Sequence, residues 1–169
     1  MNGEYIRKMP VEEFHNLALP FYEKAITNKN IDTLKLSKLL QIRTEVLTTI
    51  PETIDFLDQL PDYDVQMYIH KKSKTTLENS LENLTAAYPI LDGISDWNAD
   101  SIHEKIFAHI EALGIKNSLM LWPIRTAVSG KAVTPGGAIE IADIIGKEET
   151  LKRISIGMDK LKTALGTNA

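Results

Sequence analysis

Apolar residues recur at spacings of three and four along most of the chain, and this period predicts helices. One such stripe comprises Leu34, Leu36, Leu39, Leu40, Ile42, Val46 and Leu47, and a later one comprises Ile102, Ile106, Ile110 and Leu113. Proline or glycine follows each stripe, at Pro51 and Gly114, and ends the helix. Asp32 and Asn98 are typical N-caps, and Pro89 is expected to end the helix that precedes it. Residues 64–70 alternate loosely like a strand but have no partner strand, so we interpret them as a connector. The sequence predicts an all-α fold.

The chain length and one charged segment suggest how the helices are grouped. A chain of 169 residues can form one large or two small domains. The run Lys71-Lys72-Ser73-Lys74 follows the connector and is typical of a solvated domain boundary. We therefore expect two consecutive helical bundles, over residues 1–70 and 71–169.

Composition excludes several classes of function. The chain has no cysteine, which rules out disulfides and thiolate metal sites and fits a cytoplasmic protein. It has no run of about 18 apolar residues, so no membrane span is predicted. The four histidines lack metal-ligand spacing, since His103 and His109 lie on different helix faces. We find no catalytic constellation and predict neither a metal nor a catalytic residue.

Charge is distributed unevenly. The chain carries 19 Lys and Arg against 23 Asp and Glu, a net charge of −4, which argues against diffuse binding to nucleic acid. Yet no acidic residue occurs from Ala112 to Ile139. An RNA contacted at one local patch therefore remains possible.

The stretch from Lys116 to Gly137 holds the strongest local signals. Pro123 suits the first position of a helix, and Gly130 suits the left-handed residue that closes it. Thr134 followed by Pro135 is typical of an N-cap that opens the next helix, whose free N–H groups would bind an anion. The alternative is an ordinary helix–turn–helix corner whose positive charges are solvated.

The motifs of this stretch resemble a known family. Leu-Trp-Pro-Ile-Arg-Thr-Ala-Val-Ser-Gly followed by Thr-Pro-Gly is similar to a signature near the end of bacterial-type glutamyl-tRNA synthetases. Gly114-Ile115-Lys116 resembles the approach to that signature, and residues 146–153 the segment after it. At the other end, Met1-Asn2-Gly3-Glu4-Tyr5-Ile6-Arg7 resembles the stretch that follows the catalytic half of the enzyme. The landmarks occur in the order found in the family.

This resemblance implies the C-terminal, anticodon-binding region of such an enzyme. The family has two catalytic motifs, a His-Ile-Gly-His-like signature and a Lys-Met-Ser-Lys-Ser loop that contacts ATP, and both are absent. Lys71–Lys74 superficially resembles the second motif, but it follows the N-terminal landmark, whereas the ATP loop of the family precedes that landmark. We therefore expect a fragment that is part of a glutamate–tRNA ligase but does not aminoacylate alone, with ATP and Mg²⁺ bound by the absent catalytic half. The expected partner is the anticodon loop of glutamate tRNA, and we expect a cytoplasmic monomer that binds no membrane.

The resemblance also implies candidate tRNA-binding residues. From the second bundle and its approach they are Lys116, Arg125, Thr126, Ser129, Gly130, Lys131, Thr134, Pro135 and Gly136. Arg125 would offer a planar donor group to a base edge or a phosphate, and Pro135 an apolar surface to a base. Arg43 is a further candidate, from the first bundle. The alternative is that Arg43 is a solvated surface residue beside Glu45 and does not contact tRNA. Trp122 suits the core better than base stacking, because it lies in an apolar run.

Two functions of other classes compete with RNA binding. A helical protein-interaction module would carry a large exposed apolar face and have no salt-sensitive affinity for RNA. A complete enzyme of unknown type ranks last, because the sequence shows no convergent set of acids and bases.

Overall fold

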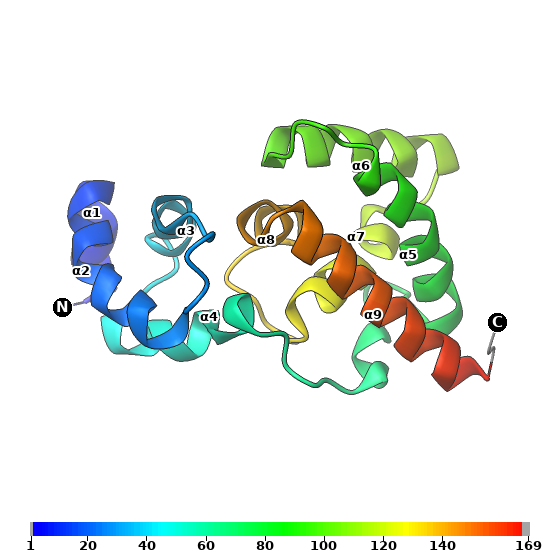
Figure 1. Cartoon of the computed structure of the whole chain (residues 1–169), viewed down its shortest axis with the longest axis horizontal. Helices are drawn as coiled ribbons and strands as arrows, with labels where there is room; N and C mark the ends of the chain where they lie inside the picture. The colour runs from blue at the N-terminus through cyan, green and yellow to red at the C-terminus, as the bar shows by residue number, and fades with distance from the viewer. Residues whose placement is uncertain (1, 167–169) are drawn as a thin grey trace.

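The computed structural model describes residues 2–166, so Met1 of the N-terminal landmark and the tail after Gly166 lie outside the described residues. The described part contains nine α-helices and two short 3₁₀-helices, and its one β-bridge is the isolated pair His70 and Thr75. The all-α prediction is confirmed (Figure 1).

The first group of helices lies at the N-terminal end of the molecule (Figure 1). It comprises α1 (Gly3–Lys8), α2 (Val11–Ala25), α3 (Thr33–Leu40), the 3₁₀-helix η1 (Leu47–Thr49) and α4 (Ile50–Asp58). Asp32 caps α3 as predicted, since its side chain accepts from Lys35 N. Helix α2 packs on both α3 and α4 and buries Phe14 between them and their neighbours.

The second group is larger. It comprises the 3₁₀-helix η2 (Val65–Tyr68), α5 (Leu77–Asp92), α6 (Ala99–Leu113), α7 (Asn117–Ser129), α8 (Ala138–Ile145) and α9 (Lys147–Leu165). Helix α5 packs chiefly on α9 and α7, and α6 contacts both α5 and α8. Asn98 caps α6, and Gly114 ends it in the left-handed conformation, both as predicted.

The connector packs with the second group, and from here the name covers residues 61–70. Helix η2 contacts α5, α7 and α9, and the hydroxyls of Tyr63 and Tyr68 lie 2.7 Å apart in the core. By packing, the first group therefore ends near α4. The division into domains at residues 70 and 71 stays a prediction.

A buried arginine joins the two groups. Arg153 of α9 has no exposed surface. Its Nη1 donates to Phe56 O (2.8 Å) at the end of α4 and to Val128 O (2.6 Å) at the end of α7. Its Nε donates to Glu149 Oε1 (2.9 Å), one turn earlier on α9. The end of α4 is thus held directly to the second group.

The predicted second helix is shorter than its apolar stripe suggests. Helix α3 ends at Leu40, and Ile42 and Val46 are exposed rather than buried. Gln41 explains the end, because its side-chain amide donates to Ile6 O (3.0 Å) and Met9 O (2.7 Å) of the α1 region. The chain then turns into η1. The prediction that the stripe forms one continuous buried face was wrong.

Two prolines that were expected at helix ends lie inside helices. Pro123 is in the middle of α7 rather than at its first position, and α5 continues past Pro89 to Asp92. Each proline removes one backbone hydrogen bond. Since α5 and α7 pack against each other, their tertiary contacts support both helices through the proline positions.

Buried tyrosines make the fold sensitive to alkali. Burial raises the pKa of Tyr22 to about 12, although the hydrogen bond with Ser37 Oγ (2.7 Å) acts in the opposite direction. Unfolded tyrosine ionises near pH 10, so the folded state loses stability as the pH rises from about 10 to about 12, by about 2–3 kcal/mol for this group. We expect the free energy of unfolding in urea to fall between about pH 10 and about pH 12. Tyr22→Phe should show a smaller fall, and an equal fall would contradict the assignment to Tyr22.

Candidate functional site

The loop after α7 begins at a position that only glycine fits. Gly130 has φ 62, and a Cβ there would lie 2.9 Å from Tyr63 Cδ1 and 3.2 Å from Pro61 O. Gly130 therefore closes α7 in the left-handed conformation, as predicted, and packs the start of the loop against the connector.

The predicted helix start at Thr134 was wrong. Helix α8 begins at Ala138, and the Thr134 hydroxyl donates to Gly136 O instead of accepting from a backbone N–H. Gly137 is extended (φ −87, ψ 177), and its N–H donates to Glu140 Oε2 (2.8 Å). A carboxylate of the chain itself thus accepts from Gly137 N, one of the backbone N–H groups expected to bind an anion.

Residues from both groups meet in a cleft, which we call the inter-bundle cleft. It has a volume of about 430 Å³ and is lined by Leu40, Arg43, Thr44, Thr49, Ile50, Glu52, Thr53, Lys131, Val133, Thr134 and Pro135. Four of the ten predicted residues line it, although Arg43 lies about 90 positions before the other three in the chain. The cleft is therefore the candidate site.

Arg43 lies in the turn after α3, not on a helix as predicted. Its side chain is exposed, and Nη1 donates to Leu39 O (2.8 Å). Glu45, the expected neighbour, pairs instead with Arg7 (3.0 Å). Within residues 2–166 no ion pair involves Arg43, so its guanidinium keeps free donors at the cleft.

Lys131 connects the loop to the opposite wall of the cleft. Its Nζ pairs with Asp55 of α4, donates to Glu52 O (2.9 Å) and lies 5.6 Å from the ring centre of Phe56. Its charge is thus partly compensated by the chain itself. Lys131 fixes the loop against α4, so the cleft has a defined width.

Val133 is a cleft residue that sequence reasoning missed. It is 84% exposed, the most exposed large apolar side chain among the described residues. A single exposed apolar residue is ordinary on a protein surface, so the sequence offered no signal that would have singled out Val133. It offers an apolar surface at the rim of the cleft.

Arg125 stabilises the loop from behind the cleft. Its Nη2 donates to Ala132 O (2.6 Å), and its guanidinium lies 4.6 Å from the ring centre of Trp122. Burial lowers the pKa of Arg125, and its buried Nε has no hydrogen-bond partner in the structure. The planar donor group expected to face a base is therefore engaged with the protein backbone.

Several predicted contact residues are buried. Thr126 and Ser129 have at most 1% of their surface exposed, and Gly130 and Pro135 are also buried. The Ser129 hydroxyl donates to Arg125 O (2.6 Å) and accepts from Lys131 N (3.2 Å). These residues shape the loop. Pro135 does not present the open apolar face that we expected.

The last two predicted residues lie beside and away from the cleft. Gly136 packs on α3, where a Cβ would lie 3.0 Å from Leu39 Cδ1. Lys116 precedes α7 and is exposed, whereas the loop follows α7. Since a helix rises about 1.5 Å per residue, the 13 residues of α7 separate Lys116 from the loop by about 20 Å.

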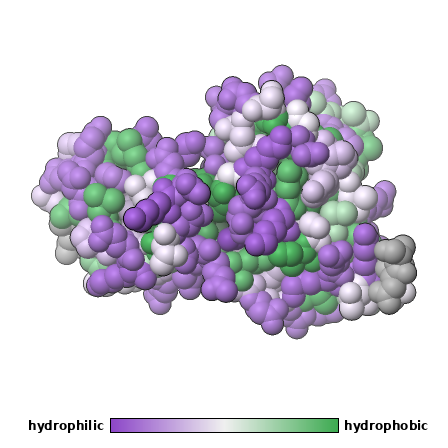
Figure 2. Space-filling view, in the orientation of Figure 1, coloured by the Kyte–Doolittle hydropathy of each residue, from purple (hydrophilic) through white to green (hydrophobic). Residues whose placement is uncertain are grey.

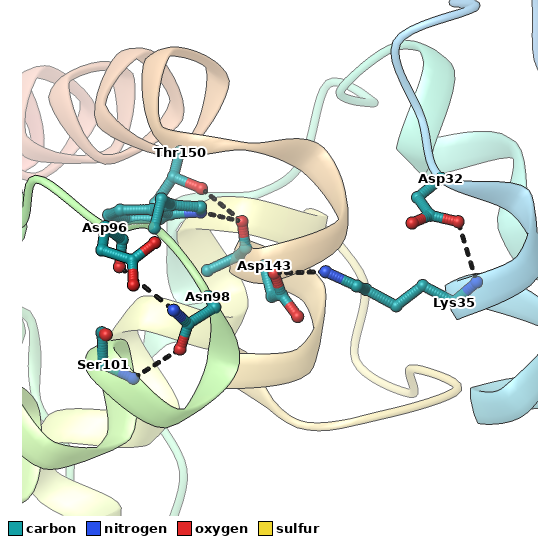
Figure 3. A network of polar contacts seen from close by, with 9 residues as sticks. Asp32, Lys35, Asp96, Asn98, Ser101, Asp143 and Thr150 are labelled. Atoms are coloured by element: carbon teal, nitrogen blue, oxygen red, sulfur yellow. Dashed lines mark hydrogen bonds and ion pairs between the residues drawn. The ribbon is translucent and has the colours of Figure 1, made fainter.

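A polar network holds the two groups together beside the cleft (Figure 3). Lys35 of α3 pairs with Asp143 of α8 at 2.9 Å, and the Asp143 side chain is only 9% exposed. In the same helix Ala142 O accepts from Trp97 Nε1 (3.0 Å) and from Thr150 Oγ1 (3.2 Å). Helix α3, which ends in the cleft wall, is thereby connected to α8.

The surface does not favour the protein-interaction alternative. The exposed large apolar side chains of the described part come from separate segments: Tyr5, Leu17, Leu34, Ile42, Val46, Ile69, Leu113 and Val133. On the face in Figure 2, apolar areas alternate with polar ones. No helix in residues 2–166 is long and apolar enough to span a membrane. The same residues contain no group of three or more His, Asp or Glu side chains suited to a metal ion.

Comparison with known proteins gives the family. The family described as "Anticodon binding domain" matches residues 13–158, which include the whole cleft. This chain belongs to the anticodon-binding domain family. Among curated relatives, the glutamate–tRNA ligase of Clostridium tetani is 58% identical over 98% of the chain, and that of Clostridium acetobutylicum is 54% identical over 96%. This anticodon-binding domain spans about a third of the length of these relatives, 34% and 33%.

Solved structures confirm the fold of this anticodon-binding domain. A glutamate tRNA ligase from Elizabethkingia meningosepticum superposes with a TM-score of 0.76 at 22% identity. The match covers 95% of this chain and 31% of the other. At that identity the likeness is one of architecture.

Proposed function

We propose that the inter-bundle cleft holds the anticodon loop of glutamate tRNA, as the anticodon-reading part of a glutamate–tRNA ligase. The observation that carries this proposal is the meeting of Arg43 with Thr134 and its neighbours in one cleft, in a chain of the anticodon-binding family. The printed names of the relatives supply the tRNA and its amino acid.

The chemistry of the cleft suits a single-stranded RNA loop. Proteins read such loops by hydrogen bonds to the edges of unstacked bases and by packing on their faces. Arg43 supplies free planar donors, and Val133 supplies an apolar surface. We therefore narrow the direct contacts to the cleft residues and assign Arg125, Thr126 and Ser129 to loop shape.

In this proposal the chain contributes RNA binding alone. ATP, Mg²⁺ and the joining of glutamate to tRNA belong to a catalytic half such as the longer relatives have. We propose that the protein acts as a monomer in the cytoplasm, where tRNA is charged.

Arg43→Ala tests the proposal. We expect it to weaken binding of glutamate tRNA by about 5- to 150-fold, because one well-formed Arg–base contact contributes about 1–3 kcal/mol. Binding of the same tRNA with an altered anticodon should change much less, so discrimination between the two RNAs should fall. Equilibrium binding at low and moderate salt measures both affinities.

Lys38→Ala is the matched control, because Lys38 is an exposed cation of α3 outside the cleft. If Arg43→Ala and Lys38→Ala weaken both RNAs equally, Arg43 contributes only charge and the cleft does not read bases. RNA affinity that is absent or insensitive to salt would instead favour the protein-interaction module.

A further inference from the structure

A second cationic surface lies at the other end of α7. The turn of residues 70–75, which we call the lysine turn, carries Lys71, Lys72 and Lys74, and Lys116 precedes α7 beside it. All four side chains are exposed. Within residues 2–166 none of them forms an ion pair or a side-chain hydrogen bond. These are uncompensated charges on an acidic protein.

The surface is built from two acid-free stretches of sequence. Residues 65–77 contain no Asp or Glu, and neither do residues 112–139. The structure brings them together: Trp122 Nε1 donates to Met67 O (3.1 Å), and the Trp122 ring stacks on His70 with centroids 3.8 Å apart. Nearby, Ser118 Oγ lies 3.5 Å from Ser73 O. Along α7, from the lysine turn to the loop of the inter-bundle cleft, neither of these two stretches contributes an acidic side chain, and we call the two stretches together the acid-free belt.

The backbone of the lysine turn is anchored, although its lysine side chains are exposed. Ser73 lies between exposed lysines and Thr75 directly follows one, yet both are buried. The Thr75 hydroxyl donates to Tyr68 O (2.7 Å) and accepts from His70 N (3.0 Å). Ser73 N donates to the His70 ring at Nδ1 (3.2 Å). The backbone thus presents its lysines at fixed positions.

Lys74 occupies an unfavourable backbone conformation. It has φ 60 and is the one residue other than glycine with positive φ in the described part of the chain. A left-handed lysine costs conformational energy that glycine or asparagine would avoid. Strain of this kind is typical of functional positions, and here the feature that lysine adds is its charge.

We propose that the lysine turn and Lys116 bind the phosphate backbone of the tRNA outside the anticodon, independently of sequence. This inference rests on the proposed function, because it places the same RNA along the acid-free belt. The surface lies about 20 Å from the cleft, the length of α7, so it contacts a part of the RNA other than the bases being read. Lysine suits this role, because phosphate contacts position an RNA without reading it.

A triple substitution tests the surface: Lys71→Gln, Lys72→Gln and Lys74→Gln. We expect affinity for glutamate tRNA to fall by about tenfold or more at low salt, and the slope of log affinity against log salt to become shallower by about two. The tRNA with an altered anticodon should lose the same factor, so discrimination should stay unchanged. Its matched control makes the same change in net charge at scattered exposed lysines: Lys29→Gln, Lys105→Gln and Lys152→Gln.

The outcomes separate this inference from the proposed function. Equal salt slopes for the two triple variants would overturn the lysine surface while leaving reading of the anticodon intact. Loss of discrimination in the Lys71, Lys72 and Lys74 variant would also overturn it, since the surface would then act on the bases. If the unchanged chain shows no salt-sensitive binding to tRNA, the proposed function fails first.

Lys74→Gly separates binding from folding. Glycine relieves the left-handed strain and removes the charge, so we expect a melting temperature no lower than that of the unchanged chain together with weaker RNA binding. Unchanged binding by a variant that folds normally would show that Lys74 does not contact RNA.

Discussion

Arg153→Met is expected to lower the free energy of unfolding by about 3–5 kcal/mol, because two buried backbone carbonyls each lose their donor at a cost of about 1–3 kcal/mol. The change leaves Phe56 O and Val128 O without their buried donor and leaves Glu149 without its ion partner. Methionine fills much of the same volume, so the loss comes mainly from unpaired polar groups. For a chain of this length the melting temperature should fall by about 6–20 °C, which thermal unfolding followed by circular dichroism would measure.

Lys152→Met is the control for Arg153→Met. Lys152 is the preceding residue on α9, is exposed, and loses the same charge on substitution. We expect its melting temperature to stay within a few degrees of that of the unchanged chain, because exposed substitutions usually change stability by about 0.5 kcal/mol or less. Similar melting temperatures for the two variants would show that Arg153 does not hold the two groups together.

Gly130→Ala is expected to destabilise the fold by about 2–4 kcal/mol, for two reasons that add. The alanine must adopt the left-handed conformation at φ 62, which costs about 1–2 kcal/mol. Its Cβ must also displace the Tyr63 ring and the backbone at Pro61, which adds a cost of overpacking. Denaturant unfolding measures the sum.

Gly114→Ala separates the two costs. Gly114 closes α6 with nearly the same φ, 65, but a Cβ there meets no atom within 4 Å. This variant should therefore show the conformational cost alone. If the two alanine variants were equally stable, the packing of Gly130 on the connector would contribute nothing to the fold.

The helices could largely be predicted, because their apolar period and their caps are local properties. Asp32, Asn98 and Gly114 act where the sequence placed them. The errors arose where distant contacts decided the outcome. Gln41 ends α3 through the α1 region, and Pro89 lies inside α5 in a helix supported by its neighbours. The burial of Arg153 could not be foreseen either, because its acceptors are carbonyls at the ends of other helices.

The candidate site could be predicted only in part. The motif resemblance selected Arg43 and Thr134, but their meeting in one cleft depends on how the two groups of helices pack. A motif also does not show which way its residues face, so Thr126 and Ser129 could not be distinguished from residues at the surface. Val133 was missed because the resemblance did not include it.

Trp122 connects the two cationic regions, the lysine turn and the loop after α7. Its indole stacks on His70 of the lysine turn and lies under Arg125, which hydrogen-bonds to the loop at Ala132. Residues that share a packing partner usually show coupled effects on stability. Substitution of Trp122 is therefore expected to loosen the lysine turn and the loop after α7 together, because one aromatic ring packs on both His70 and Arg125.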